Sequence, residues 1–243
     1  GDGSETVPAP GWWKGIYIYD GGSATLDNCV VRYGGHFHSS HLHNTRANIL
    51  KVGAGDLTVT NSIISHNSND GIRLQNTTGT VTINDSDFIA NQRDGISSDN
   101  STPVISGNTV SNNSRYGLYV DGNAIPAQVN GNTLDGNETA DLCLTANASG
   151  TFVAANNSFG GGIRILAGAI NGDTEWKSPH PYYIRGHVSV PAETTLSVSD
   201  TPAVKFAESR ALAVYGTLDA QGTSTDKLYF TDYRDDEAGG DTN

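Results

Sequence analysis

The stretch that decides the fold is residues 71–96, GIRLQNTTGTVTINDSDFIANQRDGI, because the Gly-Ile pair that opens it returns 24 residues later and closes it. The same step continues along the chain. A glycine or aspartate followed by an aliphatic residue recurs after 24, 22, 24 and 21 residues, at Gly71-Ile72, Gly95-Ile96, Gly117-Leu118, Asp141-Leu142 and Gly162-Ile163. A fixed period of this length is typical of a solenoid, in which each repeat stacks on the one before it.

Two further columns keep the same step. Asparagine precedes the first four markers by four residues, at Asn67, Asn91, Asn113 and Asn137. An apolar residue stands three residues earlier still, at Ile64, Phe88, Val110 and Leu134. Asparagine tolerates the left-handed backbone of a sharp turn, and stacked asparagines hydrogen-bond along a rod. We therefore predict a structural asparagine ladder rather than a ligand site, with Gly34 in the same column of an earlier coil.

Within each repeat the apolar residues alternate with a period of two. Ile72 and Leu74 point one way and Arg73 the other, which is the pattern of a strand. Short strands between Asn, Gly, Ser and Asp turns predict an all-β solenoid of parallel sheets, with about nine coils and a length of ~43 Å at ~4.8 Å per strand. The pattern resembles the right-handed parallel β-helices of the pectate-lyase-like superfamily over residues 14–166. The resemblance implies the handedness, and neither terminus offers an amphipathic capping helix.

The regular sequence repeat breaks after Gly168, and this break divides the chain into three predicted regions. Residues 1–170 hold the regular coils after an acidic, proline-containing loop at 1–13, and residues 171–186 form an irregular linker or a wide coil. Residues 187–243 return to short alternating strands and end in an acidic, glycine-rich loop. This last region resembles β-helix modules of bacterial and archaeal cell-surface proteins, with Glu193 in place of the usual turn glycine.

The two termini resemble halves of one such module in the wrong order. The chain ends in TDYRDDEAGGDTN and begins with GDGSETVPAPGWWKGI, so joining one copy's C-terminus to another copy's N-terminus restores the module. An uncapped solenoid exposes unpaired backbone groups at each end, and a head-to-tail contact that does not close produces an open polymer. We therefore expect a structural repeat unit of an extracellular fibre or cell-surface array. Separate subunits and tandem repeats in one long chain both remain open.

The junction between copies carries a predicted calcium site. Across it runs Asp241-Thr242-Asn243-Gly1-Asp2-Gly3, which has the D-x-N-x-D-G spacing of a calcium loop. The glutamate that normally completes such a loop is missing, so acidic residues nearby must supply the remaining carboxylate. The predicted Ca²⁺ ligands are Asp241, Asn243, Asp2, Asp235 and Asp236, and a solvated acidic loop without metal is the alternative.

A second metal hypothesis rests on histidines. Four of the seven histidines fall within HFHSSHLH, at His36, His38, His41 and His43. Histidines two apart on a strand share a face and can hold Zn²⁺, Ni²⁺ or Cu²⁺ through neutral imidazoles. No cysteine lies nearby to strengthen the set, and a polar surface loop is the favoured alternative.

Aromatic residues support two interpretations. The first is that they close the junction between copies, with the interface formed by Trp12, Trp13, Lys14, Phe230 and Tyr233. The second is a glycan-binding or adhesin module, in which the stacking platforms are Trp12, Trp13, Tyr17, Tyr19, Trp176, Tyr182 and Tyr183. We favour the first interpretation, because it agrees with the uncapped ends.

Composition bounds the function classes. Fourteen basic against 26 acidic residues give a formal net charge of −12, which argues against a nucleic-acid partner. No run of eighteen apolar residues could span a membrane, and no leader precedes Gly1, so we expect a mature or excised piece. The many Asn, Thr and Ser residues favour an extracellular or cell-surface location. Asn76 and Asn100 are the glycosylation sequons that we expect to be most exposed.

The sequence argues against an enzyme. A polysaccharide lyase or epimerase needs a base beside carboxylates or calcium, and a hydrolase needs carboxylates that face one groove. The acids look scattered here: Asp85 and Asp87 share a strand, but the residues in register with them are not acidic. We therefore assign no catalytic residue.

The two cysteines should not pair. Cys29 and Cys143 lie about four coils apart, or ~19 Å, whereas a disulfide needs Cα atoms within ~7 Å. Cys143 falls in the outward column with Tyr119 and Arg164, so we expect a partly exposed thiol. Cys29 shares a turn column with Ser62, Ser86, Asn108 and Asn132.

Overall fold

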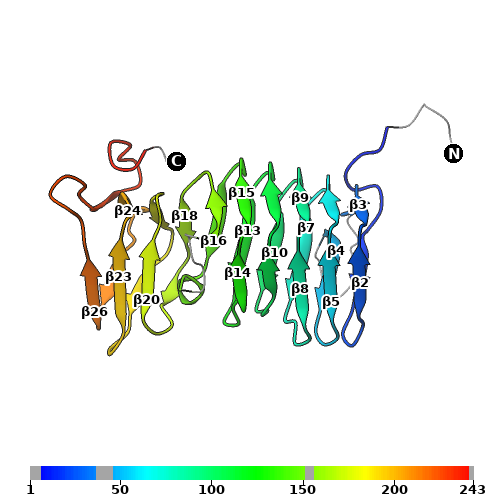
Figure 1. Cartoon of the computed structure of the whole chain (residues 1–243), viewed down its shortest axis with the longest axis horizontal. Coiled ribbons are helices and arrows are strands. Elements are labelled where there is room, and N and C mark those ends of the chain that lie inside the picture. Colours follow the sequence, from blue (N-terminus) through cyan, green and yellow to red (C-terminus); the bar gives the residue numbers. More distant parts are fainter. Residues whose placement is uncertain (1–6, 37–45, 151–155, 241–243) are drawn as a thin grey trace.

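Short strands wind repeatedly around one axis, and equivalent strands of successive coils lie side by side (Figure 1). The computed structural model describes residues 7–36, 46–150 and 156–240. Every strand pair in it is parallel, as expected when each coil brings the chain back to the same wall. The prediction of an all-β parallel solenoid is confirmed.

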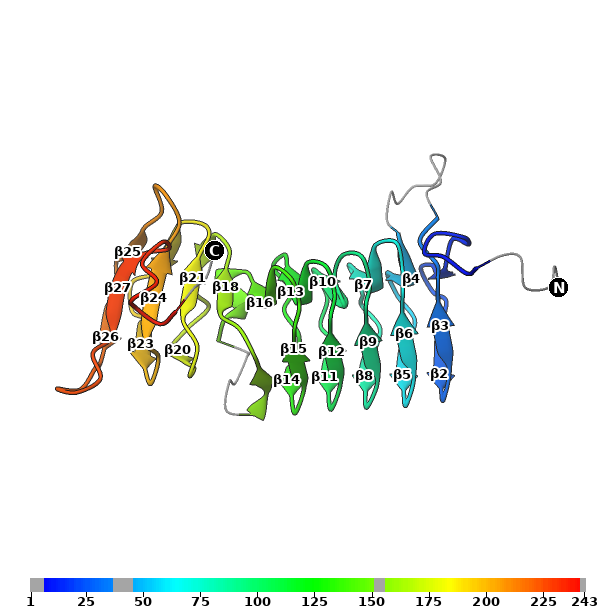
Figure 2. The same ribbon diagram turned by 90° about the horizontal axis from the view of Figure 1, so that it is seen from above.

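One wall, which we call the long sheet, runs through the whole solenoid (Figure 2). It takes ten strands, one from each coil, which is close to the expected number of coils. In sheet order these are β1 (Ile16–Ile18), β4 (Ala47–Val52), β7 (Asp70–Gln75), β10 (Ile96–Asp99), β13 (Tyr116–Asp121), β16 (Ala140–Leu144), β18 (Ile163–Ile165), β21 (Tyr182–Ile184), β24 (Ala203–Phe206) and β27 (Tyr229–Asp232).

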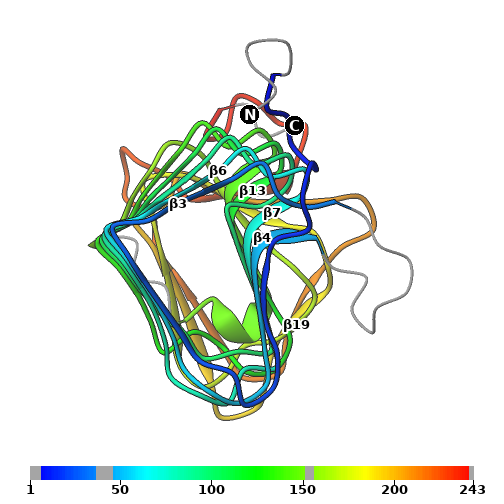
Figure 3. The same ribbon diagram turned by 90° about the vertical axis from the view of Figure 1, so that its right-hand side faces the viewer.

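The other walls are made of shorter sheets, and the view along the axis shows how the coils superimpose (Figure 3). One has β2 (Ala24–Asp27), β5 (Leu57–Thr60), β8 (Val81–Asn84), β11 (Val104–Ser106) and β14 (Gln128–Asn130). The next has β3 (Val30–Arg32), β6 (Ile63–Ser65), β9 (Asp87–Ile89), β12 (Thr109–Ser111), β15 (Thr133–Asp135) and β17 (Ser158–Phe159).

The last coils form two further walls. One contains β19 (Gly168–Ala169), β22 (Val188–Val190) and β25 (Leu212–Val214), and the other β20 (Thr174–Lys177), β23 (Thr195–Ser199) and β26 (Thr217–Ala220). Residues 171–186, expected to be a linker or wide coil, hold β20 and β21. The described residues contain a short 3-10 turn at Ala146–Ala148 and no α-helix, so no helix caps the described coils.

A column of inward side chains from the long sheet forms the spine of the core. Neighbouring strands are in register along the whole sheet, which stacks Ile16, Ile49, Ile72, Ile96, Leu118, Leu142, Ile163, Tyr182, Val204 and Phe230. The members between the ends are buried, while Ile16 is half-buried and Phe230 is exposed. The apolar core therefore reaches both ends of the described solenoid.

The asparagine ladder is confirmed, but its backbone geometry differs from the prediction. The backbone N–H of Asn67, Asn91 and Asn113 each donates to the side-chain oxygen of the next asparagine, at 3.0–3.2 Å. The left-handed conformation falls one residue earlier, for example at φ 55° in both Ala90 and Asn112. The asparagines stand in the column because they satisfy buried backbone donors, and not because they relieve strain.

The marker glycines have a packing reason. A Cβ at Gly95 would lie 2.9 Å from the carbonyl oxygen of Gly117 and 2.8 Å from the Asn113 amide nitrogen, and a Cβ at Gly71 would meet the next coil in the same way. Asp141 takes the place of a marker glycine in the coil where the asparagine column ends, because Ser158 and not an asparagine precedes the next marker by four residues. Its carboxylate fills that place, because Oδ1 accepts from Asn137 Nδ2 at 2.7 Å.

A second polar ladder follows another corner. The N–H of Cys29 donates to Ser62 Oγ, that of Ser62 to Ser86 Oγ, and that of Ser86 to Asn108 Oδ1, at 3.0–3.1 Å. Asn108 continues to Asn132 in the same manner. The turn column predicted for Cys29 is therefore present.

Candidate functional site

The outer side of the long sheet carries a chemically varied column. Because Ile72 and Leu74 point inward, Arg73 between them points outward, and so do the residues in register with Arg73. From β1 to β27 these outward residues are Tyr17, Leu50, Arg73, Ser97, Tyr119, Cys143, Arg164, Tyr183, Lys205 and Thr231. Charged and aromatic residues from the adjoining corner join its middle part, and we call this region the arginine–tyrosine face.

Two buried carboxylates lie at the centre of this face. Asp70 and Asp94 have no exposed surface, and the Asp70 carboxylate accepts from Arg73 and Arg93, each at 3.2 Å. Arg115 holds Asp94 through Nε at 2.6 Å and through Nη2. Burial, and then the charge of Asp94, raise the pKa of Asp70 to about 6, against the opposing pull of Arg93 and Arg73.

Aromatic rings flank one of these arginines. The rings of Tyr116 and Tyr119 are nearly parallel, 9° apart with centroids separated by 5.6 Å. The guanidinium carbon of Arg115 lies 4.6 Å from the first centroid and 4.8 Å from the second. The Tyr119 hydroxyl donates to Asp121 at 2.9 Å. Arg115 therefore takes part in both cation–π contacts and an ion pair.

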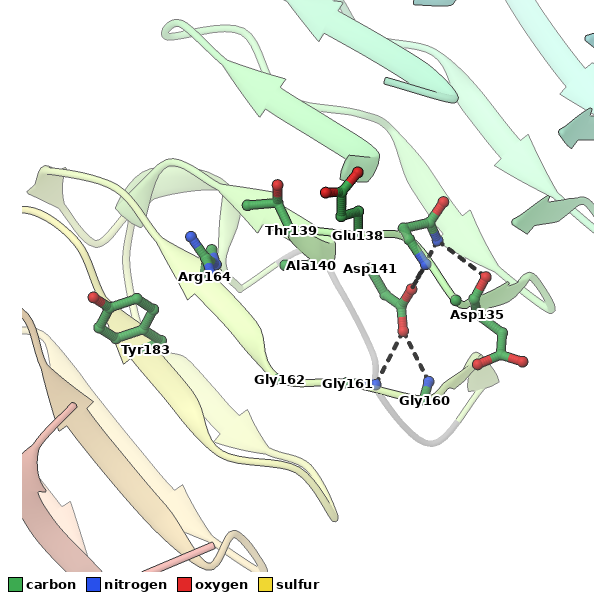
Figure 4. Close-up of a pocket in the computed structure, with 12 residues that line it drawn as sticks. Asp135, Glu138, Thr139, Ala140, Asp141, Gly160, Gly161, Gly162, Arg164 and Tyr183 are labelled. Atoms are coloured by element: carbon green, nitrogen blue, oxygen red, sulfur yellow. Dashed lines mark hydrogen bonds between the residues drawn. The ribbon is translucent and has the colours of Figure 1, made fainter. Parts of the chain in front are cut away.

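A pocket of about 560 Å³ opens beside this face, where the corner between β17 and β18 is reduced to three glycines (Figure 4). Asp135, Glu138, Thr139, Arg164 and Tyr183 line it together with Gly160–Gly162. Oδ2 of Asp141 accepts from the N–H groups of Gly160 and Gly161 at 2.9 and 3.0 Å and so fixes the glycine wall.

Arg164 brings a positive charge to the pocket. Its guanidinium lies 5.2 Å from the Tyr183 ring centroid, and Arg185 lies 5.6 Å from the same ring. Glu138 and Asp135 bring exposed negative charges to the opposite side. A pocket with carboxylate acceptors, guanidinium donors and a threonine hydroxyl suits a small ligand rich in hydroxyl groups.

The expectation that acids and bases are scattered was wrong. It compared Asp85 with Asp87, which lie on or beside a different wall. The charged cluster comes from β7 itself and from the corners that precede β10 and β13. A signal was present in the sequence: Arg93-Asp94 and Arg115-Tyr116 stand directly before two marker glycines. The sequence repeat shows which residues occupy equivalent positions in successive coils. It does not show that the charged side chains of neighbouring coils contact one another.

The expected exposure of Cys143 was also wrong. Cys143 does point outward, between Tyr119 and Arg164, but neighbouring side chains cover it completely. Burial raises the pKa of its thiol to about 12, even though the Tyr116 hydroxyl beside it acts in the opposite direction. Both cysteines are free, as expected from their separation.

The two ends of the solenoid form a second candidate site. Val30 and Trp12 are exposed at the β1 end, and Lys14 is exposed between Trp13 and β1. At the β27 end an apolar pocket of about 350 Å³, which we call the socket, is lined by Phe206, Arg210, Ala211, Leu212, Val214, Leu218 and Phe230. Trp13 is anchored, since Nε1 donates to the Arg32 carbonyl at 2.8 Å.

Comparison with protein families identifies the architecture. A family model described as a right-handed beta helix region matches residues 10–159, which is more than half of the chain. The chain belongs to the right-handed β-helix family. A search of curated proteins returned no match, and neither did a search of solved structures. No helix among the described residues is long and apolar enough to cross a bilayer.

The acidic residues near the C-terminus of this β-helix lie on a returning segment. After β27, residues 233–240 fold back over the outer face of the long sheet, where the Tyr233 and Tyr183 rings are 5.7 Å apart (Figure 2). The Lys205 ammonium donates to the Gly240 carbonyl. Asp235, on the same segment, accepts from the Thr231 hydroxyl at 2.7 Å.

The predicted metal sites stay predictions. Asp241, Asn243 and Asp2 lie outside the described residues, as do His38, His41 and His43. His36 is exposed, and its Nδ1 donates to the Gly11 carbonyl at 2.8 Å. Within the described part of the β-helix no three His, Cys, Asp or Glu side chains gather closely enough to hold a metal ion.

The remaining surface candidates divide by exposure. Trp176 and Tyr182 are buried in the β-helix, so they offer no platform for a sugar, and Tyr183 is buried as well but borders the pocket beside Arg164. Asn76 is exposed and accepts a hydrogen bond at 2.9 Å from Asn100 Nδ2. Glycosylation at these two sequons stays a prediction.

Proposed function

We propose that this β-helix is a structural repeat unit of an extracellular fibre or cell-surface array, in which copies stack head to tail. The observation that carries the proposal is the apolar core, which is open to water at the β27 end of the described solenoid and ends at the half-buried Ile16 on the other side. Phe230 is 42% exposed at the last position of the inward column, and Trp12, in the loop before β1, is 64% exposed near the other end.

The distribution of exposed apolar residues supports this role. Except for Ile63, which stands beside Val30 in an outward column, the large hydrophobic residues that are exposed lie before β1 or in the first or the last coil of the described solenoid: Val7, Trp12, Trp13, Tyr19, Val30, Val214, Tyr215, Tyr229 and Phe230. Soluble monomers rarely gather such residues into a patch unless another surface covers it. The sides of the rod instead carry charges and amides.

The sequence adds a reason to place another copy at these ends. The acidic C-terminal residues followed by the N-terminal residues of a second copy restore the D-x-N-x-D-G spacing, in which Asp241, Asn243 and Asp2 would hold Ca²⁺. Calcium at this junction is part of the proposal.

Light scattering after size-exclusion chromatography, run once in calcium and once in EGTA, tests the proposal. We expect particles of many copies in calcium that shorten or separate in EGTA. Long particles indifferent to EGTA would retain the stacking role and remove the metal. A monomer under both conditions, at every concentration tested, would refute the role.

A glycan-binding module is the second candidate function, and the pocket between Glu138 and Arg164 is the observation that favours it. An arrayed panel of neutral and acidic oligosaccharides provides the test. Binding that falls at least tenfold in Arg164→Ala, but not in Arg185→Ala outside the pocket lining, would support this function. No binding above background would exclude it.

A further inference from the structure

The two end strands of the long sheet present matching sets of residues. At the β27 end the inward column stops at Phe230, with Thr231 as its outward neighbour. At the β1 end the same two columns begin with Ile16 and Tyr17. An eleventh strand that continued the sheet would therefore meet an aromatic residue inside and a threonine outside.

The two end coils also match in chemistry, because each leaves apolar side chains partly exposed. Leu212, Val214, Leu218 and Phe230 surround the open socket at one end, and its volume of about 350 Å³ leaves apolar surface in contact with water. At the other end Ile16, Ala24 and Cys29 pack against the core but remain only partly buried. Covering one set with the other removes apolar surface from water on both sides.

Sheet edges give a second reason for contact. Strands β1 and β27 are the two edges of the long sheet as described, and each has a hydrogen-bonded neighbour on one side only. Unpaired edge groups accept another parallel strand readily, and the bonds form only in a register that also keeps apolar residues inside.

We infer that a second copy of this chain docks by adding its β1 to β27 in parallel, with Ile16 beside Phe230 and Tyr17 beside Thr231. The inference rests on the proposed function and specifies the contact that it requires. The long sheet then continues without interruption from one copy into the next, and the first coil of the incoming copy closes the socket.

Engineered cysteines test this register. In a Cys29→Ser background, Tyr17→Cys and Thr231→Cys place two thiols directly opposite each other across the junction, within the Cα separation that a disulfide tolerates. Mild oxidation should give a non-reducing gel ladder in steps of 25.5 kDa. The matched control pairs Thr231→Cys with Tyr19→Cys, two residues further along the chain. This shift of about 6.6 Å along the strand puts the two Cα atoms about 8 Å apart, beyond the reach of a disulfide, and should leave the ladder at least tenfold weaker.

The outcomes separate the inference from the proposed function. Long particles without a ladder from either pair, or equal ladders from both, would overturn the register but leave head-to-tail stacking in place. Absence of both particles and ladders would overturn the two together. Because cysteine variants can fail to fold, Phe230→Glu gives an independent check at an exposed position: association should fall at least tenfold while the melting temperature of the monomer is unchanged.

Discussion

Replacing Asn113 with alanine should weaken the fold far more than the loss of a side chain at an ordinary turn. Asn113 is buried at the centre of the asparagine ladder. Its Oδ1 accepts from the backbone N–H of Asn91 at 3.0 Å and from Asn91 Nδ2 at 2.9 Å. Its Nδ2 donates to the Phe88 carbonyl at 3.0 Å and to Asn137 Oδ1 at 2.8 Å.

The magnitude follows from the groups left without partners. Alanine removes the side-chain oxygen that accepts from the Asn91 backbone N–H, while Asn91 Nδ2 keeps a longer bond to the Ile64 carbonyl at 3.3 Å. The Phe88 carbonyl loses a donor as well. Each buried group left unsatisfied costs roughly 1–3 kcal/mol, so we expect a loss of about 2–6 kcal/mol.

Equilibrium urea unfolding followed by far-ultraviolet circular dichroism measures this loss. The control is Asn123→Ala, at an exposed turn position, which should change the free energy of unfolding by less than about 0.5 kcal/mol. A loss below about 1 kcal/mol in Asn113→Ala, or a loss equal to that of the control, would refute the argument that the ladder satisfies buried donors.

Three further predictions use single substitutions or reagents. The pKa of Asp70 is raised to about 6 from an ordinary 3.8, so the folded protein binds more protons than the unfolded chain between these two pH values. The free energy of unfolding therefore falls as pH rises through this window, by about 3 kcal/mol in total. Asp70→Asn should make the urea midpoint less dependent on pH between pH 4 and 6.5, and an unchanged pH dependence would contradict this. A thiol reagent at pH 8 should label Cys29 quickly and Cys143 only after unfolding, and two fast thiols would show that the sheet face is open. Gly95→Ala places a Cβ 2.4 Å from Val110 Cγ1 and should lower stability by about 1–3 kcal/mol. Gly161→Ala, whose Cβ would make only an ordinary contact at 3.6 Å from Asp141 Oδ2, should not, and equal melting temperatures would contradict the packing argument.

The repeat could be predicted because its columns obey simple local rules. Asparagine and glycine recur wherever each coil must satisfy a buried N–H or pass close to the next backbone, so a fixed spacing in sequence became a fixed contact in space. The left-handed turn was misplaced by one residue, onto Asn91 instead of Ala90. Backbone propensity alone favours asparagine at the left-handed position, which is Ala90. The ladder, however, requires the asparagine side chain one residue later, at Asn91.

The charged cluster could not be predicted in the same way. Arg93 and Arg115 occupy corner positions and Asp70 is the first residue of β7, where the direction of a side chain depends on the shape of the turn and not on alternation along a strand. Alternation also failed at Lys51, an inward position in register with Leu74. Its ammonium reaches the turn after β4 and donates to the Val52 carbonyl at 3.1 Å and to Ala54, so the buried charge is solvated by backbone oxygens.

The central claim is that the long sheet continues from one copy into the next, and electron microscopy of particles formed in calcium tests it most directly. Ten strands at ~4.8 Å per strand predict filaments with an axial repeat of about 48 Å and a sheet that is continuous through each junction. Rods of one copy's length at all concentrations, or filaments whose repeat exceeds one copy because the ends do not touch, would contradict it.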